Sequence, residues 1–185
     1  MARCGGTNTI KALILAAGYG TRLGELTKNK PKPLIAVGGK PVIERIVDRL
    51  RIHGIEDIVI NFHYLPDMLP KRLKAKAVYY YEPKLLGHKG TILALKPWLE
   101  TDDFFVVNGD TYSEVNYVDM ITRHKHGTIT VFMDEWRCAG TWLYCKEYFE
   151  KNLLVEPYRP QAKWFDIGTP QRLRKARSYA NEKSH

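Results

Sequence analysis

The chain has 185 residues, of which 44% are hydrophobic and 26% charged, as in ordinary globular proteins. This length is enough to bury a single core, so we expect one domain over residues 1–185, with residues 1–9 as a flexible N-terminal arm. No apolar run approaches the roughly 20 residues that a bilayer-spanning helix needs, and residues 1–9 lack the apolar centre of a secretory signal, which predicts a cytoplasmic protein without a membrane partner. The formal net charge of +9 suits a polyanionic ligand, but no helix-turn-helix, zinc-finger or RNP signature accompanies it, which argues against a nucleic-acid reader.

The three cysteines, Cys4, Cys138 and Cys145, are too few and too scattered to form a framework. An odd count without a CxxC pair argues against both a disulfide scaffold and a structural zinc site. We expect reduced, partly buried thiols.

The first half of the chain begins with a strand and a long loop. Residues 11–16 (KALILA) form a short continuous apolar run that ends in glycine, which predicts a buried strand. Residues 18–39 contain too many glycines, prolines and lysines for regular structure, which predicts a long functional loop. Pro41 then opens a helix whose apolar residues recur at helical spacing, and Gly54 ends it.

Strands and helices alternate through the remainder of the chain. The predicted strands are 57–61, 77–81, 104–108, 128–134 and 141–145. The predicted helices are 67–74, 91–98, 118–126 and a last one capped by Thr169 with Pro170 in its first turn. This pattern indicates an α/β, Rossmann-like three-layer fold with a mainly parallel sheet and helices on both faces. In such a fold ligands bind at the carboxyl ends of the strands.

The loop that leaves the first strand has the composition of a phosphate cradle. In Ala16-Ala17-Gly18-Tyr19-Gly20-Thr21-Arg22 the glycines let backbone N–H groups approach phosphate oxygens, and Arg22 can pair with a phosphate through two hydrogen bonds. The GKS/GKT ending of a Walker loop is absent. Downstream, prolines on both sides of Lys32 fix the direction of that lysine, whereas Lys28 and Lys30 are expected to be solvated.

Taken together, Leu15 to Leu23 and Pro31-Lys32-Pro33-Leu34 resemble the opening signature of the nucleotide-sugar pyrophosphorylase family, the sugar-1-phosphate nucleotidyltransferases. The resemblance implies the nucleotide-diphospho-sugar transferase type of fold. It also implies that the loop binds the triphosphate through Ala16, Ala17, Gly18, Gly20 and Thr21. Arg22 and Lys32 would then neutralise charge on the attacked phosphate and on the leaving pyrophosphate.

Two later motifs resemble the magnesium-binding landmarks of that family. Residues 106–110 (Val-Val-Asn-Gly-Asp) end in Asp110, and residues 165–170 (Phe-Asp-Ile-Gly-Thr-Pro) contain Asp166. Magnesium prefers one or two carboxylates together with substrate phosphates and water, so we expect Asp110 and Asp166 to hold Mg²⁺, with Asp110 also catalytic. Thr169 is the better-placed helix cap, which is expected to leave Asp166 free.

Three further positions resemble family residues near the nucleotide. Asn61 and Asn108 stand at the ends of predicted strands, and Gly87 lies in a loop that normally approaches the base. That loop departs from the family's Leu-Gly-Thr-Ala-Gly at His88 and Lys89, which leaves the choice of base open. His63 fits a structural hydrogen-bonding role better than a ligand role.

The middle of the chain departs most from the family. Members place a long insertion, with a Glu-Lys-Pro segment whose lysine holds the acceptor's phosphate, between two strands that here are separated only by residues 134–139. No Glu-Lys-Pro is present. Arg137 is either a substitute for that lysine or a surface arginine.

The expected function is therefore the transfer of a nucleoside monophosphate from a nucleoside triphosphate to a sugar 1-phosphate, with release of pyrophosphate. GTP is favoured first and UTP next. Two alternatives stay open: a catalytically weak nucleotide-binding or regulatory module, and a cytidylyltransferase acting on a phosphocholine-like acceptor. The base, the acceptor and the oligomeric state are not determined.

Overall fold

The computed structural model describes residues 10–73 and 76–183 as alternating strands and helices. The strands are β1 (Lys11–Leu15), β2 (Ala36–Val37), β3 (Lys40–Pro41), β4 (Ile58–Phe62), β5 (Val78–Tyr81), β6 (Phe104–Asn108), β7 (Thr111–Ser113), β8 (Thr128–Met133), β9 (Cys138–Tyr144), β10 (Leu154–Tyr158) and β11 (Trp164–Asp166). The α-helices are α1 (Glu25–Lys28), α2 (Val42–Ile52), α3 (Met68–Arg72), α4 (Gly87–Ala94), α5 (Lys96–Leu99), α6 (Tyr117–Arg123) and α7 (Pro170–Glu182). Short 3₁₀ helices are η1 (Thr21–Leu23), η2 (Lys32–Leu34) and η3 (Lys146–Phe149).

Seven of the strands form one sheet in the order β10-β8-β9-β6-β1-β4-β5. Strand β1 pairs in parallel with β4 and β6, β4 with β5, and β10 with β8. Strand β9 runs antiparallel to both of its neighbours, β6 and β8. The predicted mainly parallel sheet is confirmed, and the reversed β9 is the exception.

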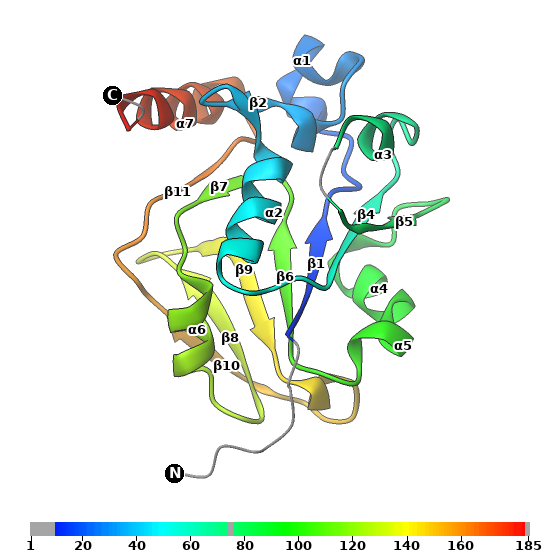
Figure 1. The fold of residues 1–185 in the computed structure, drawn as a ribbon, viewed down its shortest axis with the longest axis vertical. Helices are drawn as coiled ribbons and strands as arrows, with labels where there is room; N and C mark the ends of the chain where they lie inside the picture. Colours follow the sequence, from blue (N-terminus) through cyan, green and yellow to red (C-terminus); the bar gives the residue numbers. More distant parts are fainter. Residues whose placement is uncertain (1–9, 74–75, 184–185) are drawn as a thin grey trace.

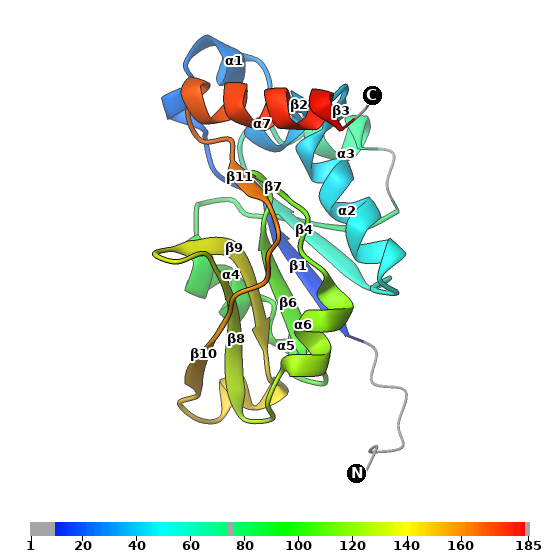
Figure 2. The same cartoon turned by 90° about the vertical axis from the view of Figure 1, so that its left-hand side faces the viewer.

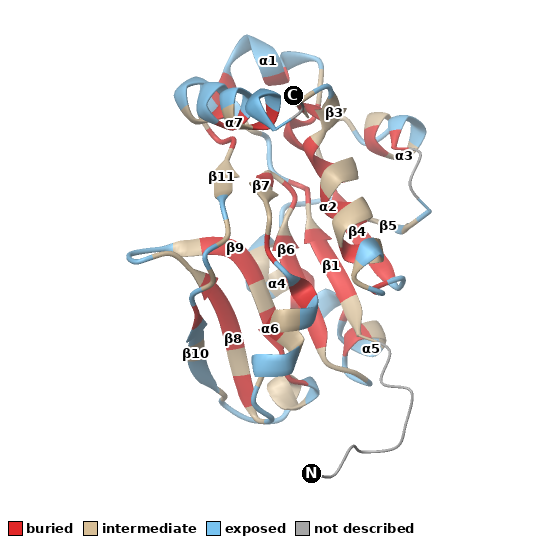
Figure 3. Ribbon diagram, turned by 60° about the vertical axis from the view of Figure 1, so that its left-hand side comes forward, coloured by how far each residue is buried: buried red, intermediate tan, exposed pale blue. Residues whose placement is uncertain are grey.

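Helices cover both faces of the sheet, as predicted (Figures 1 and 2). Helices α2 and α6 lie on one face, where α2 buries the apolar residues of its helical stripe against the alternate side chains of β1 and β4. Helices α4 and α5 lie on the other face and bury a second, smaller cluster that includes Leu13, Ile92 and Phe104. Burial is concentrated in the central strands and on the inner side of α2 (Figure 3).

The carboxyl ends of β1 and β6 point toward a cap that lies outside the main sheet (Figure 1). Helices α1 and α7 and the small β2–β3 pair lie beyond those ends. Strand β7 continues the chain after β6 and pairs antiparallel with β11, which forms a two-stranded ribbon outside the main sheet. The cap and the ribbon enclose the region that the parallel architecture assigns to ligands.

Several boundaries differ from the predictions for local reasons. The helix predicted at 91–98 begins earlier, at Gly87, and breaks before Lys96, because Pro97 can be accommodated only in the first turn of a new helix. Pro41 precedes α2 rather than occupying its first turn. The predicted helix 67–74 is α3, and its last predicted residue lies outside the described residues, as do residues 1–9.

None of the helices in the described part of the chain is both long and apolar enough to span a bilayer.

Two isoleucines of α2 provide a matched test of the core. Ile43 is completely buried and Ile52 is 81% exposed, so the same truncation has different consequences in one helix. Ile43→Ala should lower the free energy of unfolding by about 2–5 kcal/mol because it leaves a cavity. Ile52→Ala should change it by no more than about 0.5 kcal/mol. Urea denaturation followed by circular dichroism measures both, and equal effects would contradict the packing described.

Candidate active site

Two neighbouring parallel strands bring the glycine loop and the first aspartate motif together. Leu15, the last residue of β1, lies opposite Asn108, the last residue of β6. Beyond that pair, the Gly109 N–H donates to the Leu15 carbonyl at 2.8 Å. A Cβ on Gly109 would lie 2.9 Å from that same oxygen, so only glycine permits this approach. The chain then turns into Asp110 directly beside the start of the loop.

The glycine loop is shaped by contacts between Gly20, Thr27 and Lys32. Gly20 has φ +70°, a left-handed conformation that favours glycine, and a Cβ there would lie 3.0 Å from the Cβ of Lys32 and 3.0 Å from the Thr27 methyl group. The Thr27 hydroxyl donates to the Gly20 carbonyl at 3.1 Å. The loop backbone therefore lies tightly against the lysine that the two prolines orient.

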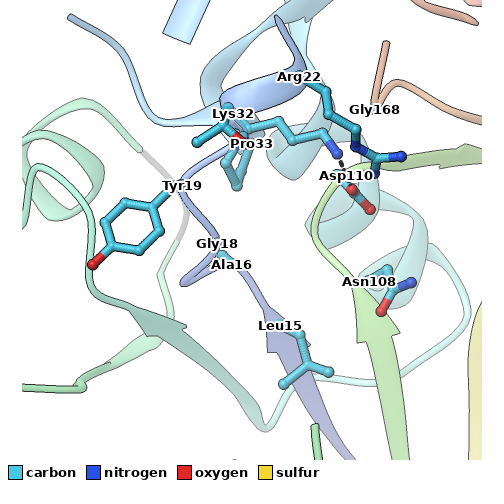
Figure 4. Close-up of a pocket in the computed structure, with 12 residues that line it drawn as sticks. Leu15, Ala16, Gly18, Tyr19, Arg22, Lys32, Pro33, Asn108, Asp110 and Gly168 are labelled. Carbon is cyan, nitrogen blue, oxygen red and sulfur yellow. Dashed lines mark hydrogen bonds and ion pairs between the residues drawn. The ribbon is translucent and has the colours of Figure 1, made fainter. Parts of the chain in front are cut away.

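Lys32 and Asp110 form an ion pair at the centre of the site (Figure 4). The Lys32 side chain is 9% exposed and that of Asp110 is 29% exposed, so the pair is largely withdrawn from water. Arg22 extends toward the same carboxylate from η1 (Figure 4). Charges held in this way act with less solvent screening than surface charges do.

The second aspartate reaches the site through the β7–β11 ribbon. Asp166 pairs with Thr111 in the ribbon, and the next residue, Ile167, donates its N–H to the Asp110 carbonyl at 3.0 Å. The expectation that Asp166 is free is wrong. Its Oδ1 accepts the Gly168 N–H at 2.7 Å, and its Oδ2 is paired with the Arg172 guanidinium of α7. Thr169 does cap α7, accepting the Arg172 N–H at 3.3 Å.

Gly168 marks the point where the charged groups converge. A Cβ at Gly168 would lie 2.6 Å from Asp166 Oδ1, 3.0 Å from an Arg22 guanidinium nitrogen and 3.2 Å from the Lys32 Nζ. Two segments that are distant in the sequence, the loop with Arg22 and Lys32 and the turn with Asp166, therefore supply two cations and a carboxylate around one position, with Asp110 paired to Lys32. A side chain on residue 168 would fill this space.

A cavity of about 400 Å³ opens beside these groups. It is lined by Leu15, Ala16, Gly18, Tyr19, Gly20, Thr21, Arg22, Lys32, Pro33, Asn108, Asp110 and Gly168. Of the predicted site residues, Ala17, Asn61, Gly87 and Asp166 are not among the lining residues. Leu15, Tyr19, Pro33 and Gly168 were not predicted, although each lies within one of the quoted motifs. Arg172, which holds Asp166, has no sequence signal beyond its place in a basic helix.

Asn61 supports the loop from beneath. Its buried side chain accepts the Ala16 N–H at 2.6 Å and donates to a Glu82 carboxylate oxygen at 2.9 Å. The Thr91 hydroxyl joins the same network through Glu82. All three side chains are buried, and they tie the start of the glycine loop to β4, to the end of β5 and to α4. Asn61 therefore positions the loop backbone.

The two histidines near the predicted base side both have protein partners. His63 contacts the Glu82 carbonyl at 2.7 Å and the Tyr19 hydroxyl at 2.9 Å, which fits the structural role expected of it. His88 lies against the ring of Trp142 and 3.1 Å from the Tyr144 hydroxyl, and burial lowers the pKa of its imidazole. Gly87, predicted to lie in a loop, is instead the first residue of α4, with φ +70° and open space around it.

A second cleft of about 430 Å³ includes Asp166 in its lining. It is lined by Arg137, Trp164, Phe165, Asp166, Gln171, Arg172 and Lys175. Arg137 comes from the turn between β8 and β9 and stacks on Trp164 at 4.8 Å. The tip of that hairpin and α7 lie on either side of β11 (Figure 2). Among the described residues, no acidic group lies within salt-bridge distance of Lys175, so the cleft carries surplus positive charge.

The donor set at Asp110 and Asp166 suits a hard divalent cation. Both groups offer carboxylate oxygens, Asp110 immediately precedes β7, which pairs with the strand that ends in Asp166, and a cavity large enough for phosphates is lined in part by Asp110. In this structure each carboxylate is neutralised by a cationic side chain, Lys32 or Arg172. The carboxylate oxygens fit Mg²⁺, which would replace Lys32 and Arg172 as their cationic partner.

Comparison with known sequences gives a consistent family. The Nucleotidyl transferase family matches over residues 11–139. A mannose-1-phosphate guanylyltransferase catalytic subunit beta from Xenopus tropicalis is 35% identical over 166 residues, which cover 82% of this chain and 46% of that protein. A mannose-1-phosphate guanyltransferase from Schizosaccharomyces pombe is 36% identical over 135 residues, which cover 66% and 37%. The chain thus spans less than half the length of these curated relatives.

Solved structures share the fold. A putative glucose-1-phosphate thymidylyltransferase from Bacillus anthracis superposes with a TM-score of 0.78 at 20% identity, covering 94% of this chain and 96% of that one. At this identity the likeness concerns the architecture alone.

Gly20 and Gly39 allow the loop's shape to be tested. Both have positive φ, but a Cβ would meet Lys32 and Thr27 only at Gly20 and nothing within 4 Å at Gly39. Alanine at either position should cost about 1–3 kcal/mol of stability through the backbone. Gly20→Ala alone should weaken binding of a nucleoside triphosphate, by roughly tenfold or more, because it displaces Lys32. Calorimetric titration of both variants measures this, and equal affinities would refute the crowding argument.

Proposed function

This chain belongs to the Nucleotidyl transferase family, and on that premise we propose that it transfers a nucleoside monophosphate from a nucleoside triphosphate to a sugar 1-phosphate. The observation that carries the proposal is the convergence of Arg22, Lys32 and Asp166 around Gly168, beside the glycine loop and Asp110. A binding module would not need two carboxylates and two cations at the end of a phosphate cradle.

The proposed reaction needs no covalent intermediate on the protein. An oxygen of the acceptor's phosphate attacks the α-phosphorus in line, the bond from that phosphorus to the bridging oxygen breaks, and pyrophosphate leaves with the electron pair. The diphosphate bond of the product forms in the same displacement. The protein's part is positioning and charge stabilisation, which account for most of the catalysis in phosphoryl-type transfer.

Each part of the site has a role in this scheme. The backbone from Ala16 to Thr21 cradles the triphosphate, and Lys32 and Arg22 neutralise charge on the α-phosphate and on the leaving pyrophosphate. Asp110 and Asp166 would hold Mg²⁺, which when bound orients the phosphates and screens their charge. Asn108, at the end of β6, lines the same cavity and contributes to nucleotide binding.

The guanylyltransferase names of the relatives favour GTP as the donor, and UTP is the second candidate to be tested. We place the reaction in the cytoplasm, where nucleoside triphosphates are available. A phosphocholine-type acceptor with CTP is the alternative to be tested beside it.

The second cleft supplies cationic side chains that could bind the acceptor's phosphate. Asp166, which lines this cleft, is two residues from Gly168 of the triphosphate cavity, and the cations of the cleft are Arg137, Arg172 and Lys175. Arg137 is paired with Asp134 and Arg172 with Asp166, so the surplus positive charge is that of Lys175. With the family's Glu-Lys-Pro segment absent, we assign the acceptor's phosphate to these cations, with Arg137 in the role of the missing lysine.

The decisive experiment measures pyrophosphate release with Mg²⁺, each common nucleoside triphosphate and a panel of sugar 1-phosphates, with CTP and phosphocholine as a separate arm. Release that requires both a triphosphate and a sugar 1-phosphate supports the proposal and identifies the base. Triphosphate binding without release in any arm would favour the binding-module alternative.

Asp110→Asn tests the carboxylate. It should lower kcat by about 10²–10³-fold, the cost of losing one group that stabilises charge in a transition state, and leave the circular dichroism spectrum unchanged. Asp48→Asn is the matched control, because Asp48 is paired with Lys40 outside the cavity. An Asp110→Asn enzyme with full turnover would overturn the site assignment.

Arg137→Ala tests the acceptor cleft. It should raise the KM for the acceptor about 10–100-fold, since hydrogen bonds to charged groups contribute about 1.5–3 kcal/mol, and leave the KM for the triphosphate unchanged. Arg123→Ala, which removes another exposed arginine paired with an aspartate on its own segment, is the control. An unchanged acceptor KM would show that Arg137 is a surface residue.

A further inference from the structure

A second cluster of ligand-type side chains lies at the opposite end of the sheet from the triphosphate cavity. His126 precedes β8, Cys145 follows β9, and Glu147 lies in η3. Strands β8 and β9 are antiparallel, so the start of one meets the end of the other, and the Cys145 N–H donates to the Thr128 carbonyl at 3.3 Å. Because Tyr144 of β9 lies opposite Phe104, the cluster is at the amino end of β6, whereas Asp110 follows its carboxyl end.

The three side chains contribute one nitrogen, one sulfur and one oxygen that converge. Their candidate ligand atoms all lie within 4.8 Å of one another. Cys145 Sγ is 3.9 Å from His126 Nδ1, and His126 Nε2 is 3.0 Å from Glu147 Oε1. The Cys145 thiol also donates to the other oxygen of Glu147. Neither the proposed reaction nor the nucleotide cavity uses any of these groups.

We propose that His126, Cys145 and Glu147 bind a zinc ion. Zinc takes nitrogen, thiolate and carboxylate ligands at about 2.0–2.3 Å in a tetrahedron, so its ligand atoms lie roughly 3.5 Å apart. The observed separations require side-chain shifts of about an ångström, together with deprotonation of the thiol. Three protein ligands leave the fourth position to water.

Cys145 is buried beside a carboxylate with which it could share a cation. The residue is completely buried, and its thiol donates to Glu147. A cation bound between the two groups stabilises thiolate and carboxylate at once. The Gly127 N–H donates to the sulfur at 3.3 Å, as N–H donors to a coordinated thiolate do.

The exposure of His126 and an unpartnered ring nitrogen of the neighbouring His124 support the same assignment. The His126 side chain is 77% exposed and that of Glu147 is 13% exposed, so an ion can enter from the histidine side. His124 lies two residues before His126, and among the described residues its buried Nε2 has no hydrogen-bond partner. A metal-bound water would offer such a nitrogen a partner.

Cobalt substitution tests the site independently of catalysis. The purified, reduced, chelator-treated protein is titrated with Co²⁺, and the sulfur-to-cobalt charge-transfer band in the near ultraviolet reports a thiolate ligand. We expect one equivalent of Co²⁺ to produce the band together with tetrahedral visible bands, and Zn²⁺ to displace it. Co²⁺ bound at Asp110 or Asp166 gives no such band, because these ligands carry no sulfur.

Cys145→Ser should abolish the band. His126→Ala should weaken the binding of Co²⁺ and Zn²⁺ by more than roughly 100-fold, which exceeds the usual cost of losing a group that only orients a ligand. His126 is exposed, so its variant keeps the test valid if Cys145→Ser fails to fold. Cys138→Ser is the matched control, because Cys138 Sγ also accepts one backbone N–H at 3.3 Å but belongs to no such cluster of ligand atoms among the described residues. Absence of the band in the unsubstituted protein, or its loss in Cys138→Ser alone, would overturn the proposal.

Discussion

The parallel pairing of β1 with β6 is the constraint on which the candidate active site depends. It places Leu15 opposite Asn108, and the close approach of Gly109 to the Leu15 carbonyl then directs the chain into Asp110 beside the glycine loop. Both strands are almost entirely buried, and their alternate side chains pack into two different core clusters. A one-residue slip would exchange the side chains between these clusters, which makes the register strongly determined. The core thus fixes the distance between the phosphate cradle and the first carboxylate.

Around that fixed point the site is built from paired charges. Lys32 is held against the loop by Gly20 and neutralises Asp110, and Arg172 neutralises Asp166. Below them, Asn61, Glu82 and Thr91 form a buried polar network whose partners satisfy one another, and it ends on the Ala16 N–H. A buried network of this kind specifies one arrangement, because an unpaired member would cost free energy.

The sequence predicted the central strands well and the peripheral ones poorly. Buried parallel strands such as β1 and β6 are continuous apolar runs, which are visible in any sequence. Strand β10 lies at the sheet edge, contains Pro157 and exposes Leu154 and Val155, so no periodic signal marked it. In the site, the glycine loop, Arg22, Lys32, Asn108 and Asp110 line one cavity, whereas Ala17, Asn61, Gly87 and Asp166 are not among its lining residues. The Arg172–Asp166 pair and the His126–Cys145–Glu147 cluster were not foreseen, because they depend on tertiary register and not on local spacing.

The β7–β11 ribbon has a consequence for the dynamics of the molecule. It lies outside the seven-stranded sheet, and β11 packs mainly on α7, β7 and β9, so the segment from β11 onward is joined to the core by fewer elements than β1 or β6 is. Such a segment can open as a cooperative unit at a lower free energy than global unfolding, and its amide protons then exchange faster than those of the central strands. Each opening would carry Asp166 and Arg172 away from Asp110 while the phosphate cradle stays folded. The fraction of time for which the site is complete therefore depends on how often this segment opens.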